Sequence, residues 1–469
     1  MTLSRQTATA LLVAAALFME ILDATVITTA IPVIAKDFGV PATHLSVGVS
    51  AYLVAVTLFI PLSGYIADKY GAKRIFMLAI CTFVMASVLC GISDSLAEFT
   101  LARILQGIGG AMMVPVGRLV VLRDAPKAQL VHLVAIITWP ALSAPLLGPV
   151  LGGWIATHWG WPWIFYINVP LGLIALLFTS RLLTNRPGSV GRFDTLGFVL
   201  SGGGFALFMT GLELLASHTS SSVIAALCCL TGLSLLAAAI FHLHRAPSPL
   251  LSFDALAYRT FRITLFGGSV VRIALASAPF LIPLMLQLGL GYSPIEAGTL
   301  LLWLFAGNLA VKPATTWLMN ATGFKRLLIA NAILIALGYL VLGLLTPQTP
   351  YVVIAVLLFV CGMNRSIHLT ALNTLAFADV PQNNMRDANT LGAMLAQMNR
   401  GLGITIGALA VTLSGILIGS TGDPAQLHFQ IAMAVMALFA LLSTVDCLLL
   451  PSNAGNAVLK KARSGSQMS

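Results

Sequence analysis

The sequence predicts an all-α, polytopic membrane protein with fourteen transmembrane helices and little soluble structure. Of its 469 residues, 58% are hydrophobic and only 9% are charged, and the mean hydropathy is +0.96. Because a soluble domain carries about 25% charged residues, this composition excludes a soluble enzyme, a secreted disulfide scaffold and a disordered chain. One spanning helix needs roughly 20 apolar residues, and stretches of that length recur along the whole chain.

Fourteen apolar stretches are separated by polar residues or by glycine and proline. The first is too long for the apolar core of a secretory signal peptide, and further spans follow it, so we interpret it as a membrane helix. The predicted spans are 8–34, 46–67, 75–93, 97–120, 129–157, 162–183, 194–215, 222–243, 263–289, 294–318, 326–346, 350–373, 388–417 and 427–450.

The lysines and arginines that lie outside these spans fall almost entirely into alternate connections. The connections on the side of the termini hold 18 of them, whereas the opposite connections hold only Lys36. Basic residues beside membrane spans mark the cytoplasmic side, so we expect both termini in the cytoplasm. The net charge of +10 then reflects topology, and no basic stripe predicts a nucleic-acid partner. The 18 residues are Arg5, Lys69, Lys73, Arg74, Arg123, Lys127, Arg181, Arg186, Arg192, Arg245, Arg259, Arg262, Lys325, Arg326, Arg386, Lys460, Lys461 and Arg463.

A short segment occurs twice. Residues 66–74 follow the second span and residues 318–326 follow the tenth, and both copies contain Gly-x-Lys-Arg. Repeated halves are typical of transporters that bind their substrate between two bundles. We therefore expect six-helix bundles at 1–183 and 263–455, with linkers and an inserted pair of helices, seven and eight, at 184–262. A basic cytoplasmic tail would follow at 456–469.

No cofactor site is predicted. The six cysteines lie inside apolar stretches, where cysteine behaves as a small hydrophobic residue, and they lack metal-binding spacing. The chain contains no GxxxxGK[ST] phosphate loop and no Ser/His/Asp constellation. We therefore expect no catalytic residues, no metal and no nucleotide, and the chain is not predicted to be an enzyme.

Several motifs stand at corresponding places in one known family. They occupy residues 22–32, 64–74, 103–107, 148–153 and 163–170. Through them the chain resembles the major facilitator superfamily, specifically its fourteen-helix drug:proton antiporter family (EmrB/QacA type). Within that family it is most similar to MdtD/HsrA-like bacterial members, through residues 110–116 and 369–374.

The resemblance implies alternating access and proton-coupled export of small lipophilic compounds, cations among them, across the bacterial inner membrane. The energy source would be the proton gradient, so no cofactor is expected. The expected partners are a small-molecule substrate, protons and the lipid bilayer. We expect a monomer. Whether the protein has partners in a tripartite efflux assembly is left open. Two alternatives also stay open: a specific metabolite exporter, uniporter or symporter of the same fold, and a non-transporting membrane regulator.

Four polar residues inside spans one and four are candidates for proton coupling. Glu20 and Asp23 are three residues apart and share a helix face, and repulsion between two acids favours proton binding by one of them. The resemblance assigns Arg103 and Gln106 to coupling as well, and Asp23 is a candidate partner for Arg103. The alternatives are structural packing for Asp23, a hydrated vestibule for Glu20 and a structural ion pair for Arg103.

Two further motifs are candidates for conformational change. The first is the loop after span two, which the resemblance assigns to gating. Its charged residues would act as a latch between the bundles. The motif consists of Gly64, Asp68, Gly71, Lys73 and Arg74. The alternative is that the basic residues only set topology. The second copy of the loop has an asparagine in place of the aspartate, so we expect a weaker latch there.

The second motif lies in span five and contains Gly148, Pro149, Gly152 and Gly153. Small residues four apart let helix backbones approach closely, and proline favours a kink. The resemblance makes this stretch a hinge that seals the transport path.

The C-terminal half offers three candidate cavity residues, Arg272, Arg400 and Gln287. Arg400 would bind an anionic group or pair with an acid of span one, so the charge of the substrate stays open. We interpret Arg365 as a side chain that extends to the cytoplasmic interface, and His368 as structural.

Overall fold

The computed structural model describes residues 5–123, 130–185, 187, 193–217, 222–247, 249–381, 384–418, 426–451 and 454–455. These residues form helices and short connections, with no strand among them, which confirms the predicted all-α class. They divide into two compact units, Met1–Leu250 with Ser293–Thr299, and Leu251–Tyr292 with Leu300–Ser469. Lys127, Arg186, Arg192 and the predicted tail at 456–469 lie outside the described residues.

The first unit contains long helices, most of them highly apolar. Its elements are α1 (Arg5–Asp37), η1 (Ala42–Leu45), α2 (Ser46–Tyr70), α3 (Ala72–Gly91), α4 (Leu96–Arg123), α5 (Leu130–His158), α6 (Trp163–Tyr166), α7 (Asn168–Leu182), α8 (Thr195–Ser217) and α9 (Ser222–Arg245).

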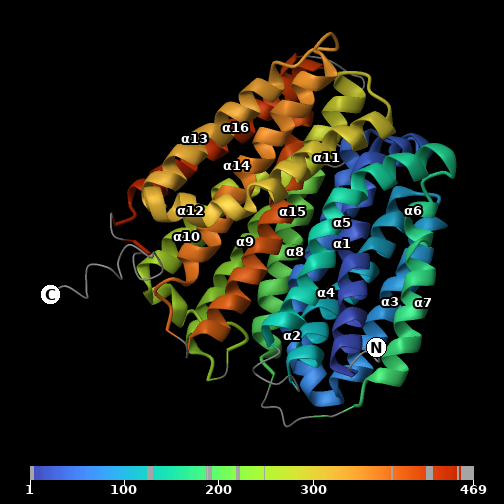
Figure 1. Cartoon of the computed structure of the whole chain (residues 1–469), viewed down its shortest axis with the longest axis vertical. Coiled ribbons are helices and arrows are strands. Elements are labelled where there is room, and N and C mark those ends of the chain that lie inside the picture. The colour runs from blue at the N-terminus through green and yellow to red at the C-terminus, as the bar shows by residue number, and fades with distance from the viewer. Residues whose placement is uncertain are drawn as a thin grey trace. The chain divides into compact units, whose positions relative to one another are not determined.

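Helix α1 packs most extensively on α5, and the two run side by side in Figure 1. Helix α4 lies against α2 and α3 and also contacts α1. As a result, polar residues on α1, α3 and α4 meet inside the unit, where they are shielded from the surrounding lipid.

Helices α8 and α9 pack chiefly on each other, and α8 also contacts α2. At the start of α8, Asp194 Oδ1 accepts a hydrogen bond from the Gly197 amide at 2.8 Å and lies 2.8 Å from His242 Nε2 of α9. Its second oxygen accepts from the Leu250 amide at 3.1 Å. Burial by itself raises the pKa of Asp194, but these bonds to Gly197, His242 and Leu250 together lower the pKa below its ordinary value.

The second unit repeats much of this arrangement. Its elements are η3 (Asp254–Ala257), α10 (Arg259–Leu284), η4 (Met285–Gly289), α11 (Pro294–Ala310, whose first residues cluster with the first unit), α12 (Lys312–Thr322), α13 (Phe324–Gly343), α14 (Tyr351–Phe377), α15 (Met385–Ile418) and α16 (Gln426–Leu448).

The same helix pairings recur in both units. Helix α1 packs on α5 and α7, and α10 packs on α15 and α16; likewise α3 packs on α4 and α7, and α13 packs on α14 and α16. The repeated loops also match, because Gly71 and Gly323 both adopt positive φ angles, 94° and 75°, that glycine tolerates best. The division into two six-helix bundles with an inserted pair stays a prediction.

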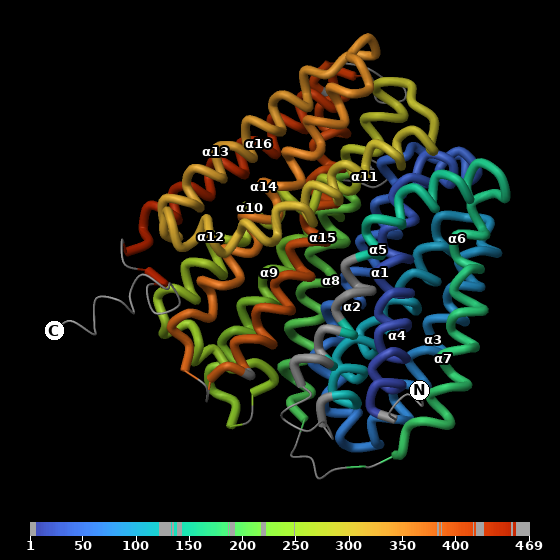
Figure 2. Tube along the Cα trace, viewed as in Figure 1, coloured from blue at the N-terminus to red at the C-terminus, as the bar shows by residue number. Residues whose placement is uncertain are grey.

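Most predicted spans coincide with a helix, but two of them are interrupted. The span at 162–183 is divided into α6 and α7. The span at 294–318 is divided into α11 and α12, which meet at an angle of 52° (Figure 2). Pro313 at the start of α12 has no N–H to continue the helical hydrogen bonds, which explains the bend.

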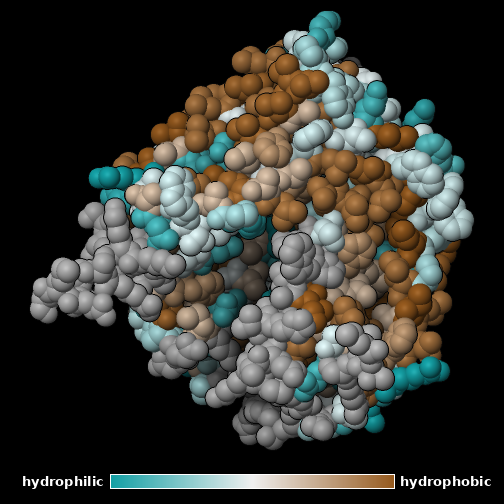
Figure 3. Space-filling view, viewed as in Figure 1, coloured by the Kyte–Doolittle hydropathy of each residue, from teal (hydrophilic) through white to brown (hydrophobic). Residues whose placement is uncertain are grey.

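The outward faces of the helices are apolar, as expected for contact with lipid. In the second unit, Leu337 and Leu340 of α13 and Leu438 and Leu442 of α16 are 42–54% exposed. Hydrophobic side chains cover this part of the surface in Figure 3. Among the described residues, 11 helices are long and apolar enough to span a membrane, or 12 with the bent pair. The chain is thus a multi-pass membrane protein, and the count of fourteen spans stays a prediction.

Candidate functional site

A buried polar cluster lies inside the first unit, among α1, α3, α4 and α7. Its members are Asp23, Ser87, Arg103, Gln106 and Asn168, and each is at most 1% exposed. Ionisable side chains inside a membrane protein are costly and usually functional. The cluster is therefore the principal candidate for a functional site in this unit.

Asp23 is the centre of the cluster. Its Oδ2 accepts a hydrogen bond from Arg103 Nη1 at 2.8 Å. Its Oδ1 accepts from Gln106 Nε2 at 2.9 Å and from Asn168 Nδ2 at 2.8 Å. Three donors from two other helices thus stabilise the negative carboxylate, and the predicted contact between Asp23 and Arg103 is present.

Arg103 is bound less completely than Asp23. Its Nη1 also donates to Gln106 Oε1 at 2.5 Å, and its guanidinium lies 4.4 Å from the centre of the Tyr52 ring, a cation–π distance. Within the described residues, Arg103 Nε and Nη2 are buried without a hydrogen-bond acceptor. The charge of Arg103 is consequently balanced by Asp23 more than by any other group, so that a proton on Asp23 would leave a buried cation without its counter-charge.

Glu20, 7% exposed, lies near the cluster on a neighbouring part of α1. A Cβ atom added at Gly110 of α4 would lie 2.9 Å from the Tyr52 hydroxyl and 3.5 Å from Glu20 Oε1. Glu20 therefore faces α4 at the level of Tyr52, and both predicted acids of α1 face the interior of the unit.

Sequence reasoning missed two members of the cluster. Ser87 accepts hydrogen bonds from Gln106 at 2.8 Å and from Asn168 at 3.2 Å. Asn168 was noted only as part of a motif, although an amide inside an apolar span must find partners. Ser87 could not be recognised from the sequence, because a serine inside an apolar helix can satisfy its hydroxyl by donating to a carbonyl of the same helix. Ser87 does so with the Phe83 carbonyl.

A third buried acid, Glu213 of α8, was also missed. It is 7% exposed, and its Oε2 accepts a hydrogen bond from Ser46 Oγ of α2 at 2.8 Å. This bond joins the α8–α9 pair to the rest of the unit. The sequence offered one indication of this residue, a glutamate inside an otherwise apolar stretch.

The motif of span five lies at a close contact between α5 and α1. A Cβ atom at Gly148 would lie 2.1 Å from Thr25 Oγ1, and one at Gly152 would lie 2.1 Å from the Val26 carbonyl oxygen. The Pro149 carbonyl accepts a hydrogen bond from Thr29 at 3.1 Å. These backbones approach too closely for any side chain larger than hydrogen.

The same motif also contacts the segment Ser293–Thr299, which belongs to the first unit. A Cβ atom at Gly153 would lie 2.4 Å from the Pro294 carbonyl oxygen, and one at Gly298 would lie 2.3 Å from the Pro149 carbonyl oxygen. Gly153 of α5 and Gly298 of the segment Ser293–Thr299 therefore permit a second close backbone contact of α5.

The predicted gating loop is held by its own unit. Lys73 Nζ donates to the Ser180 carbonyl near the end of α7 at 2.7 Å. Asn185 donates to the Tyr70 carbonyl at 3.0 Å and accepts from the Arg74 amide at 3.3 Å. Two other loop residues are less constrained. Gly64 has open space beside it, and half-buried Asp68 makes no hydrogen bond or ion pair within the described part of the chain.

The candidate cavity residues of the second unit lie on different helices. Arg272 of α10 donates to the Thr264 carbonyl at 2.8 Å and to Asn373 Oδ1 at 3.2 Å. Arg400 of α15 is exposed within its unit, and Gln287 of η4 is half-buried. His368 is fully buried, and neither ring nitrogen has a hydrogen-bond partner among the described residues.

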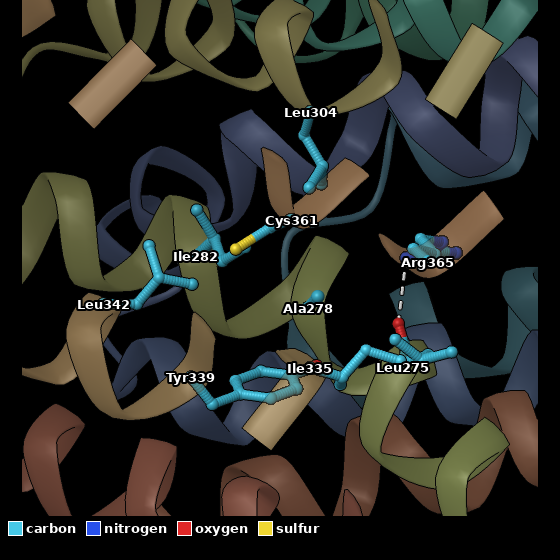
Figure 4. Close-up of a pocket in the computed structure, with 9 residues that line it drawn as sticks. All are labelled: Leu275, Ala278, Ile282, Leu304, Ile335, Tyr339, Leu342, Cys361 and Arg365. Atoms are coloured by element: carbon cyan, nitrogen blue, oxygen red, sulfur yellow. Dashed lines mark hydrogen bonds between the residues drawn. The ribbon is translucent and has the colours of Figure 1, made fainter. Parts of the chain in front are cut away.

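The interpretation of Arg365 was wrong. Its side chain does not extend to an interface but lines a cavity inside the second unit, where Nη1 donates to the Leu275 carbonyl at 2.8 Å (Figure 4). Within the described residues, no group of three His, Cys, Asp or Glu side chains is placed to hold a metal ion.

Residues 13–408 match the family model described as Major Facilitator Superfamily. A protein of Enterobacter sp. (strain 638) named putative multidrug resistance protein MdtD is 34% identical over 86% of both chains. The protein of the same name from Shigella flexneri serotype 5b (strain 8401) is 35% identical over the same shares.

Two solved structures share the fold at low sequence identity. A bacterial homologue of the human lysosomal transporter Spinster, in an inward-facing and unoccupied conformation, has a TM-score of 0.70 and 14% identity, covering 97% of this chain and 98% of that one. An auto-inhibited peptide transporter of the POT family has a TM-score of 0.66 and 14% identity, covering 93% and 96%.

Proposed function

We propose that this chain, which belongs to the Major Facilitator Superfamily, couples the export of small molecules to the inward movement of protons through Asp23. Its family makes it a membrane transporter and not an enzyme. The observation that supports proton coupling is the buried Asp23–Arg103 pair, with Gln106 and Asn168 as further donors to the carboxylate.

The coupling step is a change of charge at Asp23. When a proton binds the carboxylate, the attraction to Arg103 is lost and a buried cation is left without its counter-charge, which is strongly unfavourable. The three helices α1, α4 and α7 that meet at Asp23 then favour a different packing. Release of the proton on the other side of the membrane restores the pair. Glu20 is the second candidate carrier, because it shares the buried face of α1.

The two conformational motifs complete the cycle in this proposal. The glycine contacts between α5 and α1 act as the hinge, because closely packed backbones without side chains can slide with little steric cost. The loop after α2 acts as the gate through Asp68. The proton gradient supplies the energy, so no cofactor takes part.

The proposed substrates are small lipophilic compounds, as the family resemblance implies, and the name multidrug resistance protein of the bacterial relatives favours drugs among them. We place the protein in the bacterial inner membrane as a monomer. Both termini are assigned to the cytoplasm on the asymmetry of the basic residues.

The test is proton movement in inverted membrane vesicles that are energised by respiration and followed with a pH-sensitive dye. Lipophilic cations, neutral dyes and organic anions are added to vesicles with wild-type protein, Asp23→Asn or Glu20→Gln. Asp254→Asn, which changes an exposed carboxylate in η3, is the matched control. We expect substrate-induced loss of the gradient in the wild type and in the control, but not in Asp23→Asn.

Two outcomes would contradict the proposal. Substrate transport without proton movement in the wild type would indicate a uniporter. Full coupling in both Asp23→Asn and Glu20→Gln, at equal expression, would exclude the span-one acids as proton carriers. A response to a single compound of the panel would favour a specific metabolite exporter.

A further inference from the structure

The guanidinium of Arg103 lies against two aromatic rings as well as against Asp23. The centre of the Tyr52 ring of α2 is 4.4 Å from Arg103 Cζ, and the centre of the Phe165 ring of α6 is 6.0 Å from it. Both aromatic residues are buried, at 3% and 0% exposure. The face of an aromatic ring is electronegative and attracts a cation within about 6 Å, most strongly where water is excluded. Two uncharged groups from two other helices therefore help to stabilise the buried charge.

Helix α2 is shaped to receive the Arg103 side chain. Gly48 and Tyr52 are four residues apart, so they lie on the same face of α2. A Cβ atom at Gly48 would lie 3.9 Å from Arg103 Cγ, and the absence of one leaves room for the aliphatic part of the arginine. One turn later, a Cβ atom at Gly107 of α4 would lie 2.5 Å from the Tyr52 carbonyl oxygen. The close contact of these two backbones fixes the place from which the Tyr52 ring reaches the guanidinium.

Phe165 is held by a second set of aromatic contacts. Its ring meets the Phe99 ring edge-on with 5.6 Å between the centres, and it meets the Trp161 ring at 6.2 Å. Trp161 Nε1 in turn donates to Asp37 Oδ2 at the end of α1, at 2.8 Å. The position of the Phe165 ring is therefore determined by its packing inside the unit.

The contribution of the two rings depends on the charge of Asp23. While Asp23 is ionised, it accepts a hydrogen bond from Arg103 Nη1 and supplies the counter-charge. Loss of a ring is then offset in part, because Arg103 Nη2 has no acceptor among the described residues and is available for a second contact with the carboxylate. Once a proton neutralises Asp23, this compensation is lost, and the rings and Gln106 Oε1 continue to hold the cation. The rings therefore stabilise the proton-bound state more than the proton-free state.

The helices packed around Asp23 carry few other charges. Helix α7 contributes the neutral amide of Asn168, and α5 faces α1 with the glycines of its motif. Within the described part of this cluster Arg103 is the one cation, so a change in its stabilisation acts directly on proton binding at Asp23. The other titratable groups described beside the cluster are Glu20 of α1, Tyr52 of α2 and Cys90 of α3.

We propose that Tyr52 and Phe165 are positioning residues for proton coupling, whose rings hold the Arg103 guanidinium in place when a proton neutralises Asp23. This inference rests on the proposed function and adds the means by which the unit tolerates an unpaired buried cation. Without the rings, the proton-bound state is less stable, and Asp23 binds its proton only at a lower pH.

The test is a pH titration of Asp23 in the purified full chain in dodecylmaltoside micelles. The infrared absorption of protonated carboxyl groups is recorded as the pH is lowered, and the band that is missing in Asp23→Asn is assigned to Asp23. Tyr52→Leu is expected to lower the midpoint of this titration by about 0.5–1 pH unit, the range for loss of one cation–π contact. Phe165→Leu should lower the midpoint by less, because its ring is farther from the guanidinium.

Further variants separate the electrostatic effect of the ring from its packing. Tyr52→Phe keeps the ring and loses only the hydroxyl, which lies beside Gly110, so its midpoint should match that of the wild type. Trifluorophenylalanine incorporated at position 52 keeps the shape of the ring but withdraws electrons from its face, and it should lower the midpoint even if Tyr52→Leu does not fold. Phe59→Leu is the matched control, since it removes a ring of the same helix that packs on Phe198 of α8. It should titrate like the wild type.

Two results would overturn the inference. The first is an unchanged midpoint in folded Tyr52→Leu or with trifluorophenylalanine at position 52. The second is an equal fall in Phe59→Leu, which would show that the midpoint follows general packing. Failure of the proposed function gives a different result, because Asp23 would then show no titration in the wild type, whereas failure of this inference alone leaves a wild-type titration that the rings do not shift.

Discussion

Replacing Gly152 by alanine tests whether the close contact of α5 with α1 is essential. The added Cβ atom would lie 2.1 Å from the Val26 carbonyl oxygen and 2.6 Å from Thr29 Oγ1. Close carbon–oxygen contacts in proteins are about 3.3–3.6 Å long. The two backbones must therefore separate by roughly 1 Å, because a carbonyl of helix α1 cannot rotate away as a side chain can.

The expected cost follows from two losses. Overpacking a tight contact costs about 1–3 kcal/mol. Separation also weakens the hydrogen bond from Thr29 to the Pro149 carbonyl, which contributes about 1 kcal/mol. Gly152→Ala should thus lower the free energy of unfolding by about 2–4 kcal/mol and reduce transport further, because the hinge can no longer close.

The assay is unfolding of the purified protein in mixed micelles of dodecylmaltoside and increasing sodium dodecyl sulfate, combined with transport in vesicles. Gly203→Ala in α8 is the control, because no atom lies within 4 Å of its added Cβ and alanine favours a helix by up to about 1 kcal/mol. Equal stability and equal transport in Gly152→Ala and Gly203→Ala would refute the close contact.

Three further predictions concern the polar contacts of the first unit. In a double-mutant cycle, Asp23→Asn and Arg103→Gln should each lower the free energy of unfolding by about 3–5 kcal/mol, but the double variant should lose much less than their sum; additive losses would show that the charges do not interact. Glu213→Gln and Ser46→Ala should each speed amide hydrogen exchange in α8, with no additional effect when combined, and unchanged exchange would contradict an anchoring role. Because hydrogen bonds lower the pKa of Asp194, its stabilising effect is present above the ordinary pKa of 3.8 and is lost as the pH falls through the lower pKa of the folded state. The amides that it binds should therefore lose protection against exchange, relative to unfolded amides at the same pH, on acidification of the wild type. In Asp194→Asn their protection should be low at every pH.

Much of the fold follows from the sequence, because hydropathy alone determines where a membrane helix can form. The predicted span 326–346 became α13 (Phe324–Gly343), and 222–243 became α9 (Ser222–Arg245). The break at Val311 was not predicted, since hydropathy does not register the missing N–H of Pro313. Whether a proline bends a helix or begins one depends on the tertiary packing around it.

The candidate site was predictable only in part. Asp23 and Arg103 stand out because charges are rare inside spans, and opposite charges favour pairing. Ser87 and Asn168 complete the cluster through contacts between residues up to 145 positions apart, which no local pattern encodes. Arg365 donates to the Leu275 carbonyl of α10. Pro279, four residues later, has no N–H to bind that carbonyl, and only the folded unit brings Arg365 of α14 to it.

The two copies of the Gly-x-Lys-Arg loop show what the charged residues of this motif do locally. Lys73 donates to the Ser180 carbonyl in the last turn of α7 at 2.7 Å. Lys325 donates to the carbonyls of Leu448, the last residue of α16, and of Leu450 just after it, each at 2.8 Å. Carbonyls at the end of a helix lack partners within it and attract cations. Both lysines therefore fasten the loop to the C-terminal end of another helix of their own unit, α7 or α16, in addition to marking the cytoplasmic side. Since this function is common to both copies, a latch that works in one copy only must depend on a residue that differs between them, and Asp68 is such a residue.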